Sequence, residues 1–542
     1  MKTQIEQLSE WIEKFTIKDV PVTTQEQAKL QVLDCVASIA AGFRSHAGQK
    51  IYAALNELSC NGGKHYILPT GEYWSLENAV YLHSSLINAL ELDNFCYMGH
   101  LSESAFPVAL SVAEKLKTGE DAFLAALICA QEVSGRLGAY LASGPLQGHM
   151  RSFIHRIGAA VATVKLYQSP AHVIANAIAI ALSSPELPMF PASFSPDTKI
   201  NCVSSATVEG LRSAFLAMKS FEASLDIIEH PAGFVKNFSR LKYIPGFWQS
   251  LGKTWSIDSL SFKYYSSCAY SQGPVNAVLN AAETRKIYVN EIKAIHLHSP
   301  ILTVVMEEFS VPHYKAGLTQ VNINFSTKRS VSAALLYNGL DGNFFADRND
   351  EQYHEQINQL SERVFIHHSW KHTIEMIMGM DACLENAGYP GVFDTGTSDK
   401  TMKYLKKVYK NRTLFQSSEW KEFLKLPKGY LAYFLKRILK SYAGHKGWTR
   451  LKSFENDLSK LQFRVGSTAH IHLHSGEVLT GECTVPKGFA GDPEKNIRVI
   501  EKFRRECIPL YGMDKTNRLF NYIMTTGFPK VTEQKPVNDI SD

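Results

Sequence analysis

The sequence lacks the signatures of most metal-binding and nucleotide-binding proteins. It contains no P-loop, no G-x-G-x-x-G loop after a strand, no H-E-x-x-H helix and no EF-hand loop. Its nine cysteines are an odd number without a C-x-x-C pair, which argues against a zinc cluster and against a disulfide scaffold. We therefore expect no cofactor, no metal and a reducing, cytoplasmic location. Among enzyme chemistries, metal-free acid/base chemistry on a small molecule remains compatible with the sequence.

Long apolar runs and a leader segment are missing as well. The longest apolar stretches, such as VIANAIAIAL (173–182), reach about half of the ~20 residues that a membrane span needs. The first residues, MKTQIEQLSEWIEKF, mix charged and apolar side chains and contain no signal-peptide core. The sequence therefore predicts no transmembrane segment.

The composition is that of a globular protein, with 45% hydrophobic and 20% charged residues. A length of 542 residues allows two or three domains. The net charge of +5 is unevenly distributed, because residues 400–452 contain 15 Lys and Arg against two acids. That block has a balance of +13 and the rest of the chain one of −8. A mildly acidic protein thus contains one basic, aromatic-rich segment.

Hydrophobic periodicity divides the chain into helical and mixed regions. Runs rich in small residues, such as IGAAVATVKLY, recur in the first 255 residues and predict closely packed helices. From about residue 260, segments such as IKAIHLHS, VNINFST and ERVFIHHS have the alternation of strands and lie between helical stretches. We predict an α plus α/β protein with a large all-helical domain (1–258), a smaller α/β domain (259–490), and helices at 491–542 that return to the first domain.

The first candidate for chemistry is the segment at 87–115. Glu91 and Asp93 lie beside an apolar run, His100 follows, and Pro107 is expected to begin a helix of small residues. Two acids and a histidine near a helix start supply a general acid or base and its orienting partner. The alternative is that these residues only cap helices and hold loops.

Three further segments contain grouped cations. In 147–167, His149, Arg151 and two further basic residues precede a helix, which favours an anion site; a solvated surface is the alternative. Lys199 is expected in a loop before another helix, and Lys263 precedes two tyrosines and Cys268. A single lysine is usually surface charge, so only the combination indicates a site.

The order and spacing of five segments resemble the MmgE/PrpD family over nearly the whole chain, except part of 370–455. ALELDNF…H…P is similar to the family's A-L-D-F-D-D…H-P-S…P, and GHMRSFIHRIGAA to its G-F-H-P-T-x-x-x-G-x-x-G-A-A. TKINCVSSATVEG resembles T-K-R-L-H-x-G-x-A-A-x-x-G, and FKYYSSC resembles F-K-x-Y-P-x-C. GECTVPKGFAGDP with the later KF (502–503) resembles the closing G-x-V-x-x-x-K-G-x-P…K-F.

This resemblance implies a homodimer in which the active site lies in a cleft between a helical domain and an α/β lid. It also implies a cofactor-independent reaction on a polycarboxylate: dehydration, decarboxylation or epimerisation. His149 would be the principal acid or base, Lys199 and Lys263 would clamp carboxylates and stabilise an enolate, and Cys268 would line the pocket. The implied catalytic residues are His149, Lys199, Lys263, His100, Glu91 and Asp93, and the implied substrate-binding residues are Cys268, Phe95, Tyr265 and Arg151.

Several positions depart from the family pattern. The first aspartate is Glu91, and the histidine three residues before it is Asn88. The Arg and His after Lys199 are Ile200 and Cys202, and other neutral replacements are Asn94, Phe95 and Ala269. Because a tricarboxylate needs several cations to offset its desolvation, these losses predict a less charged, more apolar substrate. Neutral drift at supporting positions is the alternative.

Most of 370–455 is an expected insertion, because nearly 100 residues replace a short connection in the family pattern. Within it an amphipathic helix is predicted, with Lys436, Arg437 and Lys440 near its polar side. The insertion could pack on the lid, dock an acidic partner protein through 400–452, or lie on a membrane surface. We expect no nucleic acid, since no binding motif accompanies the charge. The apolar stripe consists of Leu431, Phe434, Leu435, Ile438, Leu439 and Tyr442.

The sequence thus predicts a cofactor-independent lyase, a hydro-lyase or decarboxylase, that removes a proton next to a carboxylate or carbonyl of a small molecule. Two alternatives stay open. One is isomerisation or cyclisation of a specialised biosynthetic intermediate, free or attached to a carrier. The other is a non-catalytic scaffold that binds an acidic partner through 400–452.

Overall fold

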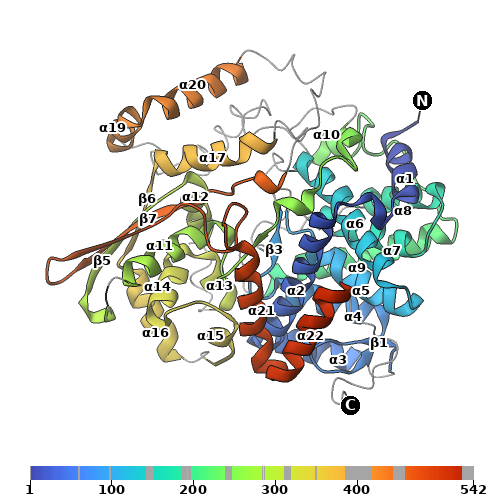
Figure 1. Ribbon diagram of the computed structural model, residues 1–542, viewed down its shortest axis with the longest axis horizontal. Coiled ribbons are helices and arrows are strands. Elements are labelled where there is room, and N and C mark those ends of the chain that lie inside the picture. The colour runs from blue at the N-terminus through green and yellow to red at the C-terminus, as the bar shows by residue number, and fades with distance from the viewer. Residues whose placement is uncertain are drawn as a thin grey trace.

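The computed structural model describes most of the chain. Helices gather on one side and a small sheet with its own helices on the other (Figure 1). None of the described helices is long and apolar enough to cross a membrane. The described residues are 2–58, 62–96, 99–141, 152–184, 192, 197–238, 247–283, 285, 287–310, 319–347, 351–384, 417–442 and 458–527.

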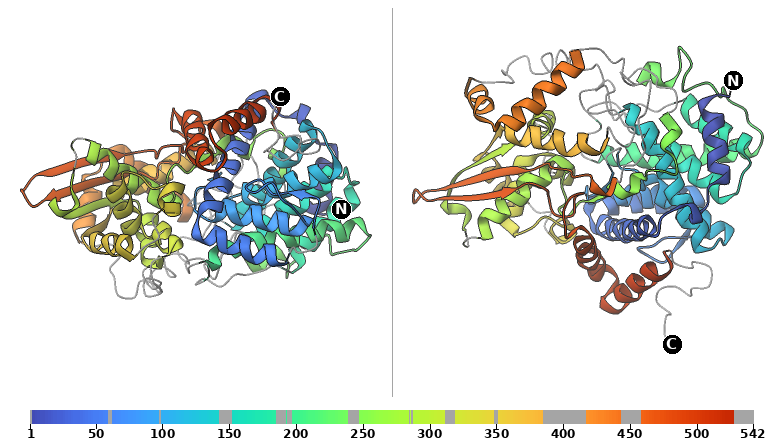
Figure 2. Two further views of the ribbon diagram at one scale, coloured as in Figure 1. Left: turned by 90° about the horizontal axis from the view of Figure 1, so that it is seen from below. Right: turned by 45° about the horizontal axis from the view of Figure 1, so that its top comes forward.

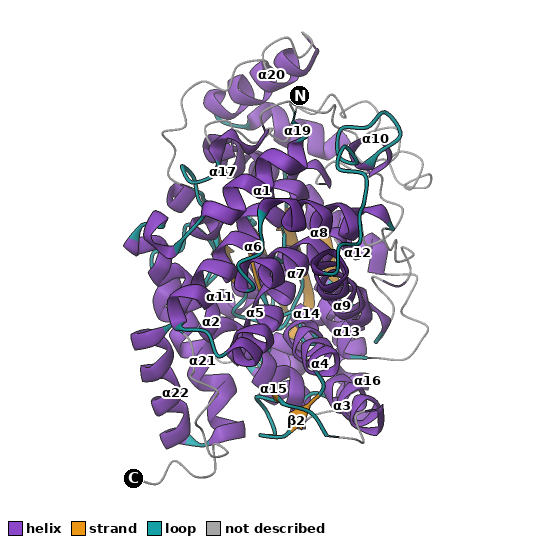
Figure 3. Cartoon of the chain, turned by 90° about the vertical axis from the view of Figure 1, so that its right-hand side faces the viewer, coloured by secondary structure: helices purple, strands orange, loops and turns teal. Residues whose placement is uncertain are grey.

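The helical side is built from the first part of the chain (Figure 3). Small residues let its helices approach closely, and Gly210 is the clearest case. A Cβ there would lie 2.1 Å from the carbonyl oxygen of Arg156, so α7 and α9 pack backbone to backbone. The helices are α1 (Gln4–Lys14), α2 (Val22–Arg44), α3 (His46–Leu58), α4 (Leu76–Asn88), α5 (Ser102–Leu116), α6 (Glu120–Leu141), α7 (Ser152–Leu166), α8 (Ala171–Ser183), α9 (Thr198–Met218) and α10 (Phe234–Phe238), with a two-stranded pair β1 (His65–Tyr66) and β2 (Tyr73–Trp74).

The other side contains a four-stranded sheet in the order β6-β5-β7-β8. β5 and β6 are parallel, whereas β5 and β7, and β7 and β8, are antiparallel. Apolar side chains such as Leu297 and Ile471 form a second core with helix α11. The strands are β5 (Ile292–Ser299), β6 (Val364–His368), β7 (Ser467–Leu473) and β8 (Val478–Cys483), and the helices are α11 (Gln272–Glu283), α12 (Ile301–Ser310), α13 (Gln320–Phe325), α14 (Thr327–Tyr337), α15 (Gly342–Asp347) and α16 (Glu351–Ser361).

Helices and a small mixed sheet agree with the predicted α plus α/β class. The end of the chain forms α21 (Lys495–Tyr511) and α22 (Met513–Thr526), which pack against α2 of the helical side (Figure 2). The first and last parts of the chain therefore lie side by side.

The basic insertion is described only in part. Helices α19 (Ser417–Lys425) and α20 (Lys428–Tyr442) lie on α17 (Trp370–Leu384). Leu431 and Phe434 of the predicted stripe pack against this apolar cluster, but Leu435 is 53% exposed, so the stripe is narrower than expected. The side chains of 437–442 and all residues at 385–416 and 443–457 lie outside the described residues.

Three local predictions were wrong. VNINFST forms helix α13 and the start of α14 instead of a strand, because Thr319 caps α13 by accepting a hydrogen bond from the Asn322 backbone. Lys199 lies in the first turn of α9 instead of a preceding loop. Pro107 lies inside α5, which already begins at Ser102. The predicted hairpin turn at Ser475–Gly476 is confirmed between β7 and β8.

Candidate active site

Two short strands bring distant parts of the chain together. β3 (Asn94–Phe95) and β4 (Ser261–Phe262) are antiparallel, with Asn94 opposite Phe262. Asp93 comes directly before β3, and Lys263 comes directly after β4. Since antiparallel pairing aligns the start of one strand with the end of the other, this carboxylate and this ammonium meet.

Lys263 lies between two carboxylates. Its Nζ donates to Glu91 Oε2 at 2.7 Å and to Asp93 Oδ1 at 2.9 Å. Lys199, from α9, forms an ion pair with the other oxygen of Glu91. All four side chains are buried. Two cations therefore offset two anions, which is the condition for keeping such charges away from water.

The loop that carries the acids is held in a strained conformation. Glu91 has φ of +53°, a left-handed conformation that costs free energy for a residue other than glycine. Lys502 on α21 donates to the Leu92 carbonyl oxygen and, at 2.8 Å, to Asp34 Oδ1. The buried Lys502 thereby fixes the loop from the C-terminal helix. It belongs to the KF segment of the family pattern.

The surroundings shift the pKa values of the buried acid and lysine in this cluster. Burial alone raises the pKa of Asp93, but Lys263 and then His100 stabilise its carboxylate more strongly, so the pKa lies below its ordinary value. Burial, and then repulsion by Lys263, lowers the pKa of Lys199 well below its ordinary value. The adjacent Glu91 carboxylate acts in the opposite direction and favours the charged form, so Lys199 is an ammonium when that carboxylate, or a substrate carboxylate in its place, lies next to it.

His100 is the most accessible member of the cluster. Its Nδ1 bonds to Asp93 Oδ2, and 23% of its side chain is exposed while that of Asp93 is fully buried. The ring lies 5.7 Å from the ring of Phe95, which packs edge-on against Phe463 and Phe489. A carboxylate on one ring nitrogen directs the other nitrogen to a reacting group, as a general acid or base requires.

Sequence reasoning missed Glu103 as a site residue. Its Oε1 accepts a hydrogen bond from Asn88, and its Oε2 lies 3.5 Å from His155 Nε2. Burial, and then the charge of Asp93, raises the pKa of Glu103 well above its ordinary value, which favours the protonated form of this carboxyl group. The sequence feature that could have identified Glu103 is its position as an acid three residues after His100, at the start of a segment expected to be helical and apolar.

Asp93, His100 and Glu103 each present one donor atom within 4.8 Å of the others. Such a set also suits a divalent cation. Lys263 already supplies positive charge to Asp93, however, and the raised pKa of Glu103 disfavours the carboxylate form that a metal ion would bind. The arrangement is therefore better matched to proton transfer than to metal binding.

An apolar wall flanks the lysines. Lys199 Nζ lies 5.2 Å from the centre of the Phe325 ring. Phe325 packs with Cys268, which precedes the short 3-10 helix Ala269–Ser271, and with Val305 and Phe309 of α12. Burial raises the pKa of the Cys268 thiol, so it stays neutral. One side of the site thus offers apolar surface beside its cations.

The structure brings five of the predicted catalytic residues together: Glu91, Asp93, His100, Lys199 and Lys263. Phe95 lies against His100, and Cys268 lies in the apolar wall. Tyr265 lies apart, buried in the core beneath the sheet with its ring against Tyr264. His149 and Arg151 lie outside the described residues.

Two of the departures from the family pattern have structural partners. Asn94 donates to Asp34 Oδ2 at 3.0 Å and accepts from Gln31 at 2.8 Å, so a neutral amide links α2 to β3. Ile200 packs in a small apolar cluster with Ala47 and Ala89. The neutral residues at these two positions therefore have matching neighbours: hydrogen-bonding side chains around Asn94 and apolar side chains around Ile200.

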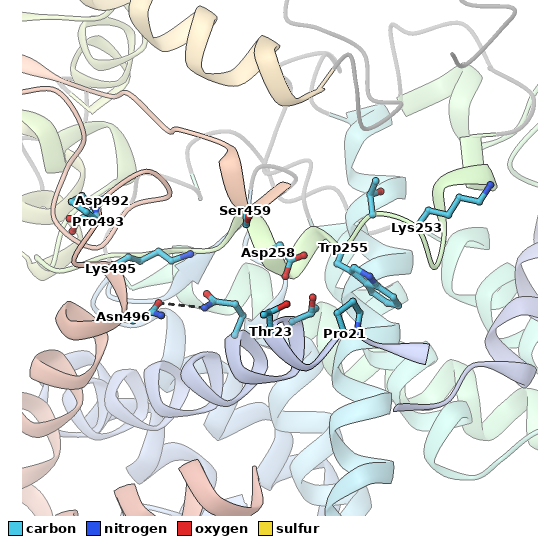
Figure 4. Close-up of a pocket in the computed structure, with 13 residues that line it drawn as sticks. Pro21, Thr23, Lys253, Trp255, Asp258, Ser459, Asp492, Pro493, Lys495 and Asn496 are labelled. Atoms are coloured by element: carbon cyan, nitrogen blue, oxygen red, sulfur yellow. Dashed lines mark hydrogen bonds between the residues drawn. The ribbon is translucent and has the colours of Figure 1, made fainter. Parts of the chain in front are cut away.

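A groove of about 780 Å³ lies elsewhere, between the start of α2, residues 253–258 and the start of α21 (Figure 4). Its notable cation is Lys495, whose pKa burial lowers to about 8. Lys495 Nζ donates to the Leu260 carbonyl oxygen at 3.2 Å, next to β4. The groove contains none of the predicted site residues.

Comparison with known proteins gives one family and one kind of relative. The profile described as MmgE/PrpD N-terminal domain matches residues 6–244. Cis-aconitate decarboxylase of Homo sapiens is 27% identical over 258 residues, which are 44% of this chain and 52% of that protein. Cis-aconitate decarboxylase of Aspergillus terreus is 25% identical over 296 residues, 51% of this chain and 59% of that protein. The chain thus matches only about half to three fifths of the length of these relatives.

Proposed function

We propose that the protein is a cofactor-independent lyase of the MmgE/PrpD family, whose N-terminal-domain profile matches residues 6–244. An enolate forms next to a carboxylate or carbonyl of the substrate. In a dehydration it forms by removal of a proton and then expels hydroxide, which leaves as water; in a decarboxylation it forms by loss of carbon dioxide and then takes up a proton. The observation that carries the proposal is the buried contact of Lys263 with Glu91 and Asp93, beside the Asp93–His100 pair. Relatives named cis-aconitate decarboxylase support the decarboxylase form.

The lysines bind the substrate and stabilise the charge that develops. A substrate carboxylate competes with Glu91 for Lys199 and Lys263, which are already gathered at one point. When a proton leaves the adjacent carbon, negative charge spreads onto the carboxylate oxygens as an enolate. Fixed ammonium groups in a buried site lower the energy of that state more than water does.

Proton transfer is assigned to the Asp93–His100 pair and to Glu103. Asp93 holds His100 by Nδ1, so the imidazole removes the proton through Nε2. The protonated Glu103 then supplies a proton, either to a leaving hydroxyl group or to the carbon that has lost carbon dioxide. His149 remains our proposed second acid or base, and Arg151 a proposed contact for the substrate.

We propose a substrate with fewer charges than a tricarboxylate. Each carboxylate needs compensation in a buried site, and the chain replaces several family cations with neutral residues such as Ile200 and Ala269. The wall around Phe325 favours an apolar arm next to the bound carboxylate. A homodimer with the site between helical domain and lid, and an acidic partner at 400–452, also remain proposals.

A panel of acids tests this function. Wild-type protein is mixed with cis-aconitate, 2-methylcitrate, and mono- and dicarboxylates that carry an alkyl arm; thermal shift, carbon dioxide release and loss of water are measured. We expect stabilisation and turnover with one of the less charged acids. Tight binding and normal turnover of a tricarboxylate contradict the substrate class, and absence of turnover with every acid contradicts the lyase.

The nearest alternative is an isomerase. It uses the same proton removal and returns the proton to another carbon or the other face. The pair of His100, as base, and Glu103, as acid, is what such a transfer requires. Product analysis by NMR distinguishes it, because an isomer keeps the mass of the substrate.

A further inference from the structure

The sheet carries an unusual group of histidines on one face. In β5, His296 and His298 point to the same side because they are two residues apart. His298 is paired with His367 on β6, and His296 is paired with His470 on β7. We call His296, His298, His367, His470 and His472 the histidine face.

The opposite side of the same strands belongs to the core. Ile295, Leu297 and Ile471 are buried there with α11, which lies with α14 and α16 below the sheet in Figure 1. The histidine face itself is partly open to solvent. Its neighbours Phe365 and Val478 are 45% and 46% exposed. A small ion in solution can therefore reach the imidazoles.

The imidazoles form one contiguous array. His296 Nδ1 and His367 Nε2 are 2.9 Å apart. The ring of His298 stacks on that of His367 at 5.1 Å, while His472 and His470 meet His296 and His298 edge-on at 5.1 and 5.5 Å. Imidazole rings from three adjacent strands are thus in contact, and one pair of ring nitrogens, on His296 and His367, is already at hydrogen-bonding distance.

No carboxylate among the described residues forms an ion pair with these five side chains. Burial, and then the neighbouring His367 and His470, lowers the pKa of His298 to about 4. Burial also lowers the pKa of His296 and of His367. These shifts favour the neutral form of His296, His298 and His367 at neutral pH, and neutral imidazole is the form that binds transition metals.

We propose that the histidine face binds one divalent transition-metal ion, such as Cu²⁺, Ni²⁺ or Zn²⁺, through His296 and His367, with His298 as third ligand. Two nitrogens bonded to one such ion at ~2.0–2.1 Å lie about 2.9–3.4 Å apart. The 2.9 Å between His296 and His367 falls at this separation. His298 joins them by rotation of its ring, a torsion with a broad energy profile.

The ion would fasten β5 to β6. β5 leads directly into α12, which supplies Val305 and Phe309 to the apolar wall beside Lys199. The proposal is independent of the lyase function, because none of its ligands belongs to the candidate active site.

Full-length, tag-free protein is stripped of metal and titrated with Zn²⁺ and Cu²⁺ by calorimetry. We expect one ion per chain and at least a 10-fold weaker Kd in H296Q/H367Q. H298Q should be weakened less. The matched control H46Q/H172Q removes two exposed histidines from the helical side and should bind as wild type. Circular dichroism verifies that each variant is folded.

The Asp93, His100 and Glu103 set is the competing site, so E103Q is titrated in parallel. Unchanged binding by E103Q, with nitrogen hyperfine coupling in the Cu²⁺ EPR spectrum that is lost in H296Q/H367Q, supports the histidine face. Wild type without binding, H296Q/H367Q with wild-type affinity, or loss of binding in E103Q overturns it.

Discussion

The helical side and the sheet side of this molecule treat histidine in opposite ways. On the helical side His100 bonds to Asp93 and His155 lies against Glu103. On the sheet side the five rings of the histidine face contact one another and neutral neighbours such as Thr480, and no described carboxylate forms an ion pair with them. An imidazole oriented by a carboxylate is suited to move protons, whereas a neutral array of imidazoles is suited to hold a metal ion. The group that contacts the imidazole therefore determines whether the histidine is suited to proton transfer or to metal binding.

Removing Lys263 should have the largest effect. K263M leaves Glu91 and Asp93 buried without their shared cation and removes the stabilisation of an enolate. We expect kcat/KM to fall about 10³-fold or more, by analogy with the loss of a transition-state donor. Steady-state kinetics on the acid selected from the panel measures it.

Two variants keep that result interpretable. K263R retains the positive charge and should recover part of the activity. K293M removes an exposed lysine from β5 and should have wild-type kinetics. If K263M turns over substrate as fast as K293M, Lys263 does not contribute to catalysis, and the assignment of proton chemistry to the cluster on the helical side is wrong.

Lys502 tests whether the acid loop is held from the C-terminal helix. K502M leaves Asp34 buried without its cation and frees the Leu92 carbonyl oxygen. Breaking one partner of a buried pair should lower the free energy of unfolding by about 3–5 kcal/mol, measured by urea denaturation. The double variant D34N/K502M should be more stable than K502M alone. A double variant that is equally unstable would show that the pair is not coupled.

His83 is a third kind of histidine: it is buried on the helical side, and no carboxylate among the described residues forms an ion pair with it. Its Nε2 accepts from the Leu68 backbone, and burial lowers its pKa to about 3. Since the unfolded chain binds a proton at higher pH, the stability contributed by neutral His83 is complete above pH ~6.5 and is lost as the pH falls towards ~3. The loss reaches up to about 5 kcal/mol.

H83Q should therefore flatten the dependence of unfolding free energy on pH in that window. Urea denaturation at a series of pH values measures it. The exposed control H172Q should keep the wild-type slope, and an unchanged slope in H83Q contradicts the assignment.

Glu103 should give the smallest effect in this series. E103Q retains the size of the side chain and removes its acidic proton, so kcat should fall about 10²-fold with little change in KM. Because the pKa of Glu103 is raised, wild-type activity should decline when the pH rises through that pKa, and E103Q should lose this alkaline decline. A change in KM alone would make Glu103 a binding residue instead.

Sequence patterns predicted the candidate site better than its surroundings. Glu91, Asp93, His100, Lys199 and Lys263 were chosen from short motifs up to 172 residues apart, and the structure brings them together. The motifs predict this proximity because each of the five residues lies at or within a few residues of the start or end of a helix or strand. Glu103 was missed since its significance depends on His155 and Asn88, which no spacing rule connects to it.

Local patterns were weaker for secondary structure. The alternation in VNINFST predicts a strand, but the Thr319 cap favours a helix, and both Val321 and Asn322 are buried there. The histidine face was also not foreseen. IKAIHLHS and ERVFIHHS identified strands, but only the pairing of β5 with β6 sets their histidines next to one another.

Deuterium incorporation tests the central claim most directly. Wild type and D93N are each incubated in D₂O with the acid selected from the panel, and ¹H NMR follows the carbon next to the carboxylate. We predict that wild type introduces deuterium at that carbon, in the substrate or in the product, and that D93N does not. No incorporation by wild type with any acid, or equal incorporation by D93N, would contradict the account.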